Sequence, residues 1–238
     1  MPEGGHRPTR PAVTAPVPAA LVFDFDGLIC DTETMVFESV RRVFVDHGAD
    51  LTLEEWLPAV GAAEAPDWPA ALEAAVGRSL DRAMLTAARQ GHGEQLLAAL
   101  AVLPGVVALL DAAHAASVPC GLASNSPRSW VTGNLARFAL ADRFDVVVAV
   151  EEVTNPKPDP EPYLRAVAAL GASPASAVGL EDTLIGVTAA RRAGLYTVAV
   201  PGPMSAHHDF AGADLVVDSL AAVTLPALGE GVARRARP

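Results

Sequence analysis

The pattern of hydrophobic and polar positions divides this chain into three stretches. A short apolar run at 21–25 is rich in β-forming residues and is typical of a buried strand in a parallel sheet. Between 32 and 101 no strand-like run occurs, and apolar residues recur at helical spacing instead. From 104 to 217 short apolar runs alternate with helical patterns, which indicates parallel strands joined by crossover helices.

The same pattern predicts the individual elements. In the helical stretch, helices are expected at 34–47, at a short segment opened by the Thr52 capping box, and at 70–76, 80–89 and 94–101. In the alternating stretch, helices are expected at 106–116, 129–138, 161–170 and 184–193, and strands at 118–123, 146–150, 177–180, 197–200 and 215–217. Right-handed crossovers would place these strands in one parallel sheet with helices on both faces.

The predicted fold class is therefore α/β, a doubly wound, Rossmann-like sheet with an inserted all-helical cap. The expected divisions are a core at 20–31 and 102–230, a cap at 32–101, a disordered N-terminal tail at 1–19 and a C-terminal tail at 231–238. The first tail has no apolar segment of signal-peptide length. The second contains the basic cluster Arg234, Arg235 and Arg237, which we expect to be solvated.

Composition narrows the possible partners. The formal net charge is −11, and no basic patch is visible, so nucleic-acid binding is not expected. No uninterrupted apolar run reaches the roughly 18 residues of a membrane span. Cys30 and Cys120 are too few for a disulfide scaffold, and a cytoplasmic monomer is the expectation.

Two acids follow the first predicted strand, in the sequence Asp24-Phe25-Asp26-Gly27. Burying a carboxylate costs several kcal/mol unless something compensates it, so a purely structural strand has no use for this pair. Both acids can avoid that cost at the carboxyl end of the strand, where open α/β sheets bind ligands. There one carboxylate can act as a nucleophile, its neighbour can move a proton, and a divalent cation can hold both.

The string DFDGLICDTE, residues 24–33, resembles the first motif of the haloacid dehalogenase superfamily, in the branch of β-phosphoglucomutase and the small-molecule phosphatases. The resemblance extends over about 21–201. It implies that Asp24 is the nucleophile and that Asp26 is the general acid and base, with the Asp26 carbonyl also contacting Mg²⁺. Asp31 and Thr32 are expected to cap the helix that follows.

A second group of polar residues, Ser124, Asn125 and Ser126, follows the strand predicted at 118–123. A small hydroxyl beside exposed backbone N–H groups suits a phosphoryl oxygen. Ser124 matches the phosphate-binding serine or threonine of the family, and Asn125 adds a second donor, so both are expected to bind substrate. Helix capping is the alternative use of this group, and Ser126 before Pro127 suits it well.

Lys157 is the one lysine of the chain, among 17 basic residues, and it lies between Pro156 and Pro158. The prolines restrict the backbone, and the absence of arginine here indicates a need for a compact ammonium. In the resembling family this lysine contacts the nucleophile and the transferring phosphoryl group, so Lys157 is expected to be both catalytic and substrate-binding.

The acids Glu181 and Asp182 follow the strand predicted at 177–180. Together with Asp24 and Asp26 they would form an oxygen-rich Mg²⁺ site. Asp182 is expected to bind the ion, and Glu181 either directly or through water. Of the tryptophans, Trp68 is placed near the active-site entrance and Trp56 and Trp130 in the core.

The expected function is a Mg²⁺-dependent phosphatase that hydrolyses a small phosphorylated metabolite through a phosphoaspartyl intermediate. The alternative is a sugar phosphomutase of the β-phosphoglucomutase type, but the position that matches the mutases' cap histidine is Val36, which cannot relay a proton. A phosphonoacetaldehyde hydrolase would need a cap lysine, which is absent from 32–101. A non-enzymatic protein on this fold would lack a nucleophile or ligand, and none is missing.

Overall fold

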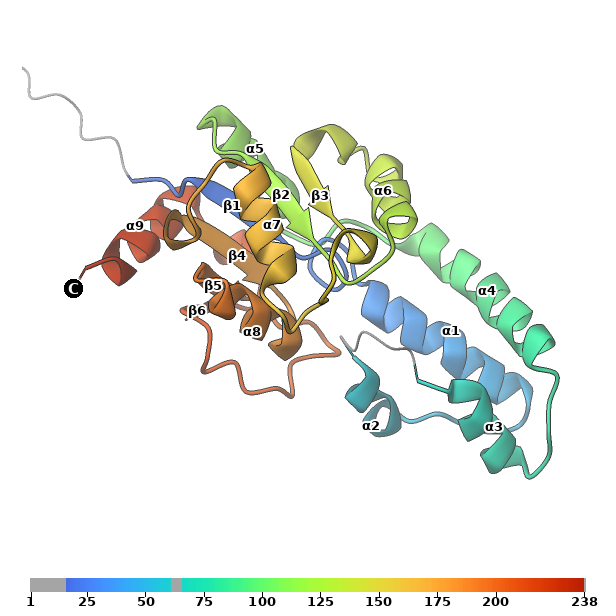
Figure 1. The fold of residues 1–238 in the computed structure, drawn as a ribbon. Helices are drawn as coiled ribbons and strands as arrows, with labels where there is room; N and C mark the ends of the chain where they lie inside the picture. Colours follow the sequence, from blue (N-terminus) through green and yellow to red (C-terminus); the bar gives the residue numbers. More distant parts are fainter. Residues whose placement is uncertain (1–15, 61–65, 238) are drawn as a thin grey trace, which may run out of the picture.

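The computed structural model describes residues 16–60 and 66–237. Within these residues a six-stranded parallel sheet has the order β3-β2-β1-β4-β5-β6 (Figure 1), so the predicted fold class is confirmed. The strands are β1 (Ala20–Phe23), β2 (Cys120–Ala123), β3 (Val146–Val148), β4 (Ala177–Glu181), β5 (Tyr196–Ala199) and β6 (Leu215–Val216). Most of the tail predicted at 1–19 lies outside the described residues.

Strand β1 lies at the centre of the sheet and pairs with β2 on one side and β4 on the other. Successive side chains of a strand point to opposite faces. Leu21 and Phe23 accordingly join one hydrophobic cluster, whereas Ala20 and Val22 join another. Because the ladder ends at Phe23, two residues before the end of the predicted strand, the acids that follow are outside the regular sheet.

Helices cover both faces of this sheet (Figure 1). The cluster around Leu21 and Phe23 packs against α5 (Val106–Ala115), α6 (Arg128–Arg137) and α9 (Leu225–Arg235). The cluster around Val22 packs against α7 (Glu161–Ala169) and α8 (Leu184–Arg192). Short 3-10 turns occur at Leu57–Ala59, Ala141–Arg143, Val150–Glu152, Pro174–Ser176 and Leu220–Ala222. The middle turn shortens the strand predicted at 146–150.

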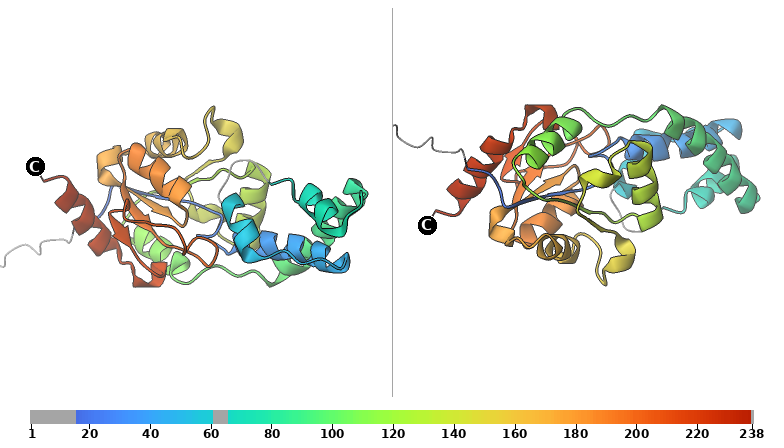
Figure 2. Two further views of the ribbon diagram at one scale, coloured as in Figure 1. Left: turned by 90° about the horizontal axis from the view of Figure 1, so that it is seen from below. Right: turned by 90° about the horizontal axis from the view of Figure 1, so that it is seen from above.

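The remaining helices gather beside the sheet, beyond the end at which β1 stops (Figure 2). They are α1 (Thr32–Asp46), α2 (Leu53–Trp56), α3 (Trp68–Val76) and α4 (Arg82–Ala99). We call α1–α4 the helical segment. It has its own hydrophobic cluster, to which Trp56 contributes and into which Met204 inserts from the loop after β5. Separate packing of this kind supports the proposed division into core and cap.

Helix α4 differs from the sequence prediction, because the helices expected at 80–89 and 94–101 are one continuous helix. Gly91 and Gly93 lie at the predicted break, and each glycine costs a helix about 1 kcal/mol relative to alanine. The contact between α4 and α1 compensates that cost, since a Cβ on Gly93 would already touch the Cβ of Ser39 at 4.0 Å. Tertiary packing therefore overrides local propensity.

The C-terminal segment also differs, because residues 231–235 belong to α9 and are not a tail. Arg235 donates hydrogen bonds to the Leu195 carbonyl and to Asp214, so it is not the solvated arginine that was expected. Gly231 lets the helix approach closely, since a Cβ there would lie 2.5 Å from the Tyr196 ring. Across the described ranges, no helix combines the length and apolar character needed to cross a membrane.

Candidate active site

The polar groups predicted from the sequence meet where the strand order reverses. Strands β2 and β3 extend the sheet to one side of β1, and β4 and β5 extend it to the other. Asp24 follows β1, Ser124 follows β2, and Glu181 and Asp182 end and follow β4. Such a reversal opens a crevice at the carboxyl ends of the strands, so three distant parts of the chain lie together.

Gly27 makes the turn after the two acids possible. Its φ is +80°, a conformation that residues with a side chain rarely adopt. A Cβ on Gly27 would also lie 2.0 Å from Oδ2 of Asp182. The glycine is therefore required twice, for the turn itself and for the approach of the Asp182 carboxylate.

The ammonium of Lys157 lies between two carboxylates. Nζ donates hydrogen bonds to Oδ1 of Asp24 and to Oε1 of Glu181, each at 2.5 Å. It also lies 5.0 Å from the centroid of the Tyr163 ring. The Lys157 side chain is 4% exposed. Burial alone would lower its pKa, but the two carboxylates outweigh burial and raise the pKa above its ordinary value. The lysine is therefore held in its charged form next to the predicted nucleophile.

Glu181 is fully buried, and both of its oxygens accept hydrogen bonds. Oε1 accepts from Lys157 and from the Tyr163 hydroxyl, at 2.5 and 2.7 Å. Oε2 accepts from the Asp182 amide and from the amide and hydroxyl of Thr183. A Cβ on Gly186 would lie 1.8 Å from Oε1, so the carboxylate is seated directly on the first turn of α8. This arrangement makes Glu181 an anchor for Lys157.

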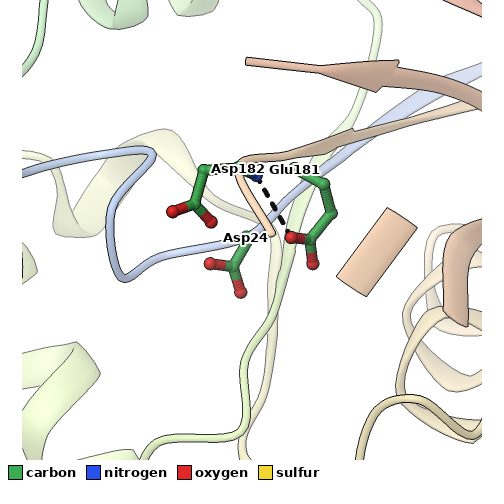
Figure 3. A group of neighbouring side chains, drawn as sticks. All are labelled: Asp24, Glu181 and Asp182. Carbon is green, nitrogen blue, oxygen red and sulfur yellow. Dashed lines mark hydrogen bonds between the residues drawn. The ribbon is translucent and has the colours of Figure 1, made fainter. Parts of the chain in front are cut away.

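Asp24, Glu181 and Asp182 form a cluster in which one oxygen of each lies within 4.8 Å of the others. Figure 3 shows these side chains converging from the ends of β1 and β4. Burial raises the pKa of both Asp24 and Asp182 well above the ordinary value, and the charges of neighbouring carboxylates add to the effect. One ammonium faces three carboxylates, so negative charge is in excess.

A divalent cation fits this cluster. Oδ1 of Asp182 is buried and has no hydrogen-bond partner in the described residues, and a buried acceptor without a partner is costly. Magnesium prefers carboxylate oxygens and binds few of them. Asp24 and Asp182 are the side chains suited to contact it, because the Glu181 oxygens are already engaged.

The second acid, Asp26, is held by donors from two parts of the chain. Thr32 at the start of α1 and the indole N–H of Trp130 donate to Oδ1, at 2.7 and 2.9 Å. The Ser126 hydroxyl donates to Oδ2 at 2.5 Å, and the Ser124 hydroxyl lies 3.5 Å from the same oxygen. The Asp26 carboxylate is thereby oriented by both the core and the helical segment.

The structure assigns different positions to Ser124 and Asn125, two of the three residues predicted to bind substrate. Ser124 is 2% exposed and its oxygen accepts the Ser126 amide at 3.0 Å, beside the nucleophile's cavity. Asn125 instead holds the lysine loop. Its Oδ1 accepts the Lys157 amide at 2.9 Å, and its Nδ2 donates to the Lys157 carbonyl at 3.2 Å. Both polar ends of Asn125 are thus used to fix Lys157.

Two adjoining cavities open at this site. A small cavity of about 90 Å³ is lined by the polar groups just described, among them Asp24, Ser124 and Lys157. A larger cavity of about 590 Å³ lies between α1, α4 and the start of α6. Val36 lines the larger cavity, which places the residue compared with the mutase histidine beside the site.

The roles of several residues of the site were not predicted from the sequence. Trp130 packs against the core as expected, but its indole N–H also donates to Asp26. Ser126 was weighed as a helix cap, but its hydroxyl donates to Asp26. Tyr163 gave no signal beyond its place on an apolar helix face. Trp68 was expected near the entrance, but it begins α3 and packs against the hydrophobic cluster of the helical segment. Asp31 caps α1 as predicted, accepting the Thr34 amide at 3.1 Å.

Comparison with known proteins shows which family this chain matches. Residues 21–200 match the family described as haloacid dehalogenase-like hydrolase. The protein YhcW of Bacillus subtilis, named as a presumed phosphatase, is 38% identical over 88% of this chain and 95% of its own length. The phosphorylated carbohydrates phosphatase of Thermotoga maritima is 32% identical, over 74% of this chain and 82% of its own.

The same fold is found in solved structures. The crystal structure of a presumed β-phosphoglucomutase from Thermotoga maritima superposes with a TM-score of 0.71. It is 27% identical, and the match covers 92% of this chain and 99% of that one.

Proposed function

The chain belongs to the family of haloacid dehalogenase-like hydrolases and is thus an enzyme, and we propose that it is a Mg²⁺-dependent phosphatase of small phosphorylated sugars or similar phosphomonoesters. The observation that carries this proposal is the Lys157 ammonium, held 2.5 Å from Asp24 in a small polar cavity. The named phosphatases among its relatives support the same reaction class.

In the proposed reaction, an oxygen of Asp24 attacks phosphorus and forms a phosphoaspartyl intermediate as the bond to the alcohol oxygen breaks. Asp26 gives a proton to the departing alcohol and later takes one from the water that hydrolyses the intermediate. Positioning of Asp26 by Thr32 and Trp130 supports this role, because proton transfer requires a defined geometry.

Charge on the phosphoryl group would be balanced by two features of the site. Lys157 supplies a fixed ammonium beside the nucleophile, and Ser124 supplies a hydroxyl that lines the same cavity. Asp24 and Asp182 would hold Mg²⁺ with the Asp26 carbonyl, and the bound ion would neutralise phosphoryl oxygens and the excess carboxylate charge. Asn125 acts indirectly, by fixing the lysine loop.

The helical segment would act as the cap that closes over the site and selects the substrate. Thr32 at its start and Trp130 in the core both bond Asp26, so movement of the segment would be felt directly at the proton-transfer group. A small metabolite, and not a phosphoprotein, suits a cavity of about 590 Å³. We also propose that the enzyme is a cytoplasmic monomer.

The direct test measures phosphate release from a panel of phosphorylated metabolites by the purified chain, with Mg²⁺ or with EDTA. Turnover should require Mg²⁺ and should be lost in Asp24→Asn, because an amide cannot form the acyl phosphate. Asp26→Asn should lose about 10²- to 10⁴-fold, the typical contribution of proton transfer. Wild-type rates in Asp24→Asn would contradict the proposed nucleophile.

A sugar phosphomutase is the second candidate, because a presumed β-phosphoglucomutase is among the structural neighbours. The apolar side chains of Met35 and Val36 line the larger cavity and argue against it, since neither can relay a proton. A hydrolase should release phosphate without interconverting hexose 1- and 6-phosphates. Bisphosphate-primed interconversion that is faster than phosphate release would identify a mutase instead.

A further inference from the structure

The small and the large cavity share three lining residues, Asp26, Glu33 and Ser126. The proposed function places the phosphoryl group in the small cavity beside Asp24 and the alcohol part in the large one. The ester oxygen and the first carbons of the alcohol would then pass between these three side chains. They form the boundary at which the enzyme meets the part of the substrate next to the phosphate.

Glu33 is the member of this boundary whose role is still unassigned. Asp26 and Ser126 bond each other at 2.5 Å, whereas Glu33 forms no hydrogen bond or ion pair with any residue that the structure describes. Its position in the first turn of α1, directly after Thr32, holds it against the site. Burial, with the charges of Asp26 and Asp31 adding to it, raises the pKa of Glu33 to about 7. Because no described residue binds the Glu33 carboxyl group, this group is available to a ligand.

The rest of the large cavity shows what kind of ligand would suit that carboxyl group. Three acids, Asp26, Glu33 and Glu94, line the cavity against one base, Arg89. The hydroxyls of Thr32 and Ser39 and the amide of Gln90 add neutral polar groups. An acidic lining repels a second anionic group, whereas carboxylates accept hydrogen bonds well from hydroxyls.

We propose that Glu33 is a specificity-determining residue, which hydrogen-bonds a hydroxyl of the alcohol part near the ester and thereby selects polyol and sugar monophosphates over substrates with a carboxylate or second phosphate at that place. This inference rests on the proposed function and refines it. The selection comes from repulsion as much as from attraction, since a carboxylate of the substrate would face both Glu33 and Asp26.

A matched pair of small substrates tests this role. In 2-hydroxyethyl phosphate and phosphoglycolate the carbon next to the ester carbon carries a hydroxyl or belongs to a carboxylate, respectively, and the remainder is the same. The wild-type enzyme should show the higher kcat/KM for 2-hydroxyethyl phosphate. At pH 8, where Glu33 is mostly charged because the pH lies above its pKa of about 7, the ratio of the two kcat/KM values should fall about tenfold or more in Glu33→Gln. The reason is that a hydrogen bond to a charged acceptor weakens and the repulsion of the carboxylate disappears.

The control is Glu38→Gln, which makes the same change on the same helix. Glu38 pairs with Arg41 and lines neither cavity. Its kcat/KM ratio should equal that of the wild type. A purely structural role for Glu33 would lower both kcat/KM values by the same factor, and an unchanged ratio in Glu33→Gln would overturn the inference.

The same measurements separate this inference from the proposed function. If the wild-type enzyme hydrolyses phosphomonoesters in Mg²⁺ but prefers phosphoglycolate, the selection by Glu33 is wrong and the phosphatase assignment stands. If the wild-type enzyme releases phosphate from neither probe nor from any sugar phosphate, the proposed function fails, and the inference fails with it.

Discussion

The Nζ atom of Lys157 lies 2.5 Å from Oδ1 of Asp24, although the two residues are 133 positions apart in the chain. The lysine reaches this place because Asn125 holds its backbone at both the amide and the carbonyl. Glu181 and the Tyr163 ring complete its surroundings. The contact therefore depends on residues at or beyond the ends of four different strands, β1, β2, β3 and β4.

Lys157→Arg should lower kcat/KM by about a hundredfold or more, although it keeps the positive charge. The side chain is 4% exposed and lies among Asp24, Glu181 and Tyr163, so the broader guanidinium has no room there. Steady-state kinetics and a thermal melt of the same protein would separate lost chemistry from lost folding. Kinetics within a few-fold of wild type would show that only charge is needed at this position.

Asp182→Asn should abolish stabilisation by Mg²⁺. For the wild type, Mg²⁺ at about a hundred times its Kd should raise the melting temperature by roughly 5–10 °C, because it binds the folded state only. The variant removes the charge of the proposed metal ligand, whose Oδ1 is buried and has no hydrogen-bond partner among the residues that the structure describes. Differential scanning calorimetry in EDTA and in Mg²⁺ gives the shift directly.

The matched control for that experiment is Asp142→Asn, at an exposed aspartate in the turn before β3. It should keep the full Mg²⁺ shift. A normal shift in Asp182→Asn would mean that the ion binds elsewhere or does not need this residue.

Tyr163→Phe should lower kcat by several-fold and leave KM nearly unchanged. The hydroxyl donates to Glu181 at 2.7 Å, and its loss leaves that buried carboxylate with one donor fewer while the ring beneath Lys157 stays. Stability should also fall by about 1–3 kcal/mol, the usual cost of a lost buried hydrogen bond to a charged group.

The only other tyrosine, Tyr196, provides the control. It lies on β5 and packs against Gly231, so Tyr196→Phe should leave kcat at its wild-type value. Equal kinetic effects of the two substitutions would show that Tyr163 acts on stability and not through Lys157.

Glu33 should make the metal-free protein less stable as the pH rises. Its pKa is raised from 4.5 to about 7 in the folded state, so between these values the folded protein binds more protons than the unfolded one. The free energy of unfolding then falls with pH through this window and levels off above it, by up to about 3 kcal/mol.

Urea denaturation in EDTA measures this effect. Glu33→Gln should match the wild type near pH 4 and be more stable at pH 8, whereas Glu38→Gln should follow the wild type throughout. If the free energy of unfolding of Glu33→Gln changed by the same amount as that of the wild type between pH 4 and 8, the result would contradict a buried, destabilising Glu33.

Much of the fold was predictable because local pattern and tertiary environment agree in the core. The strands and their alternation with helices follow from short continuous apolar runs, which a buried parallel strand requires, and from period-3.6 patterns, which a helix packed on one face requires. Prediction failed where distant packing decides. Separate helices were predicted at 80–89 and 94–101, on either side of Gly91 and Gly93, but contact with α1 keeps α4 continuous. The C-terminal basic residues were read as a tail, but Arg235 binds Asp214.

By itself the sequence determined which chemical groups the protein presents and after which strands they come. Two acids after an apolar run, a lone lysine between prolines and an acidic pair after a later strand are local patterns, and the rule that ligands bind at carboxyl ends of parallel strands brings them to one edge. Only the tertiary structure decided how they pair. It assigned Asn125 to the lysine loop, Glu181 to Lys157 and Trp130 to Asp26. These contacts join residues far apart in sequence, and their geometry depends on how the strands and helices pack, which no local pattern encodes.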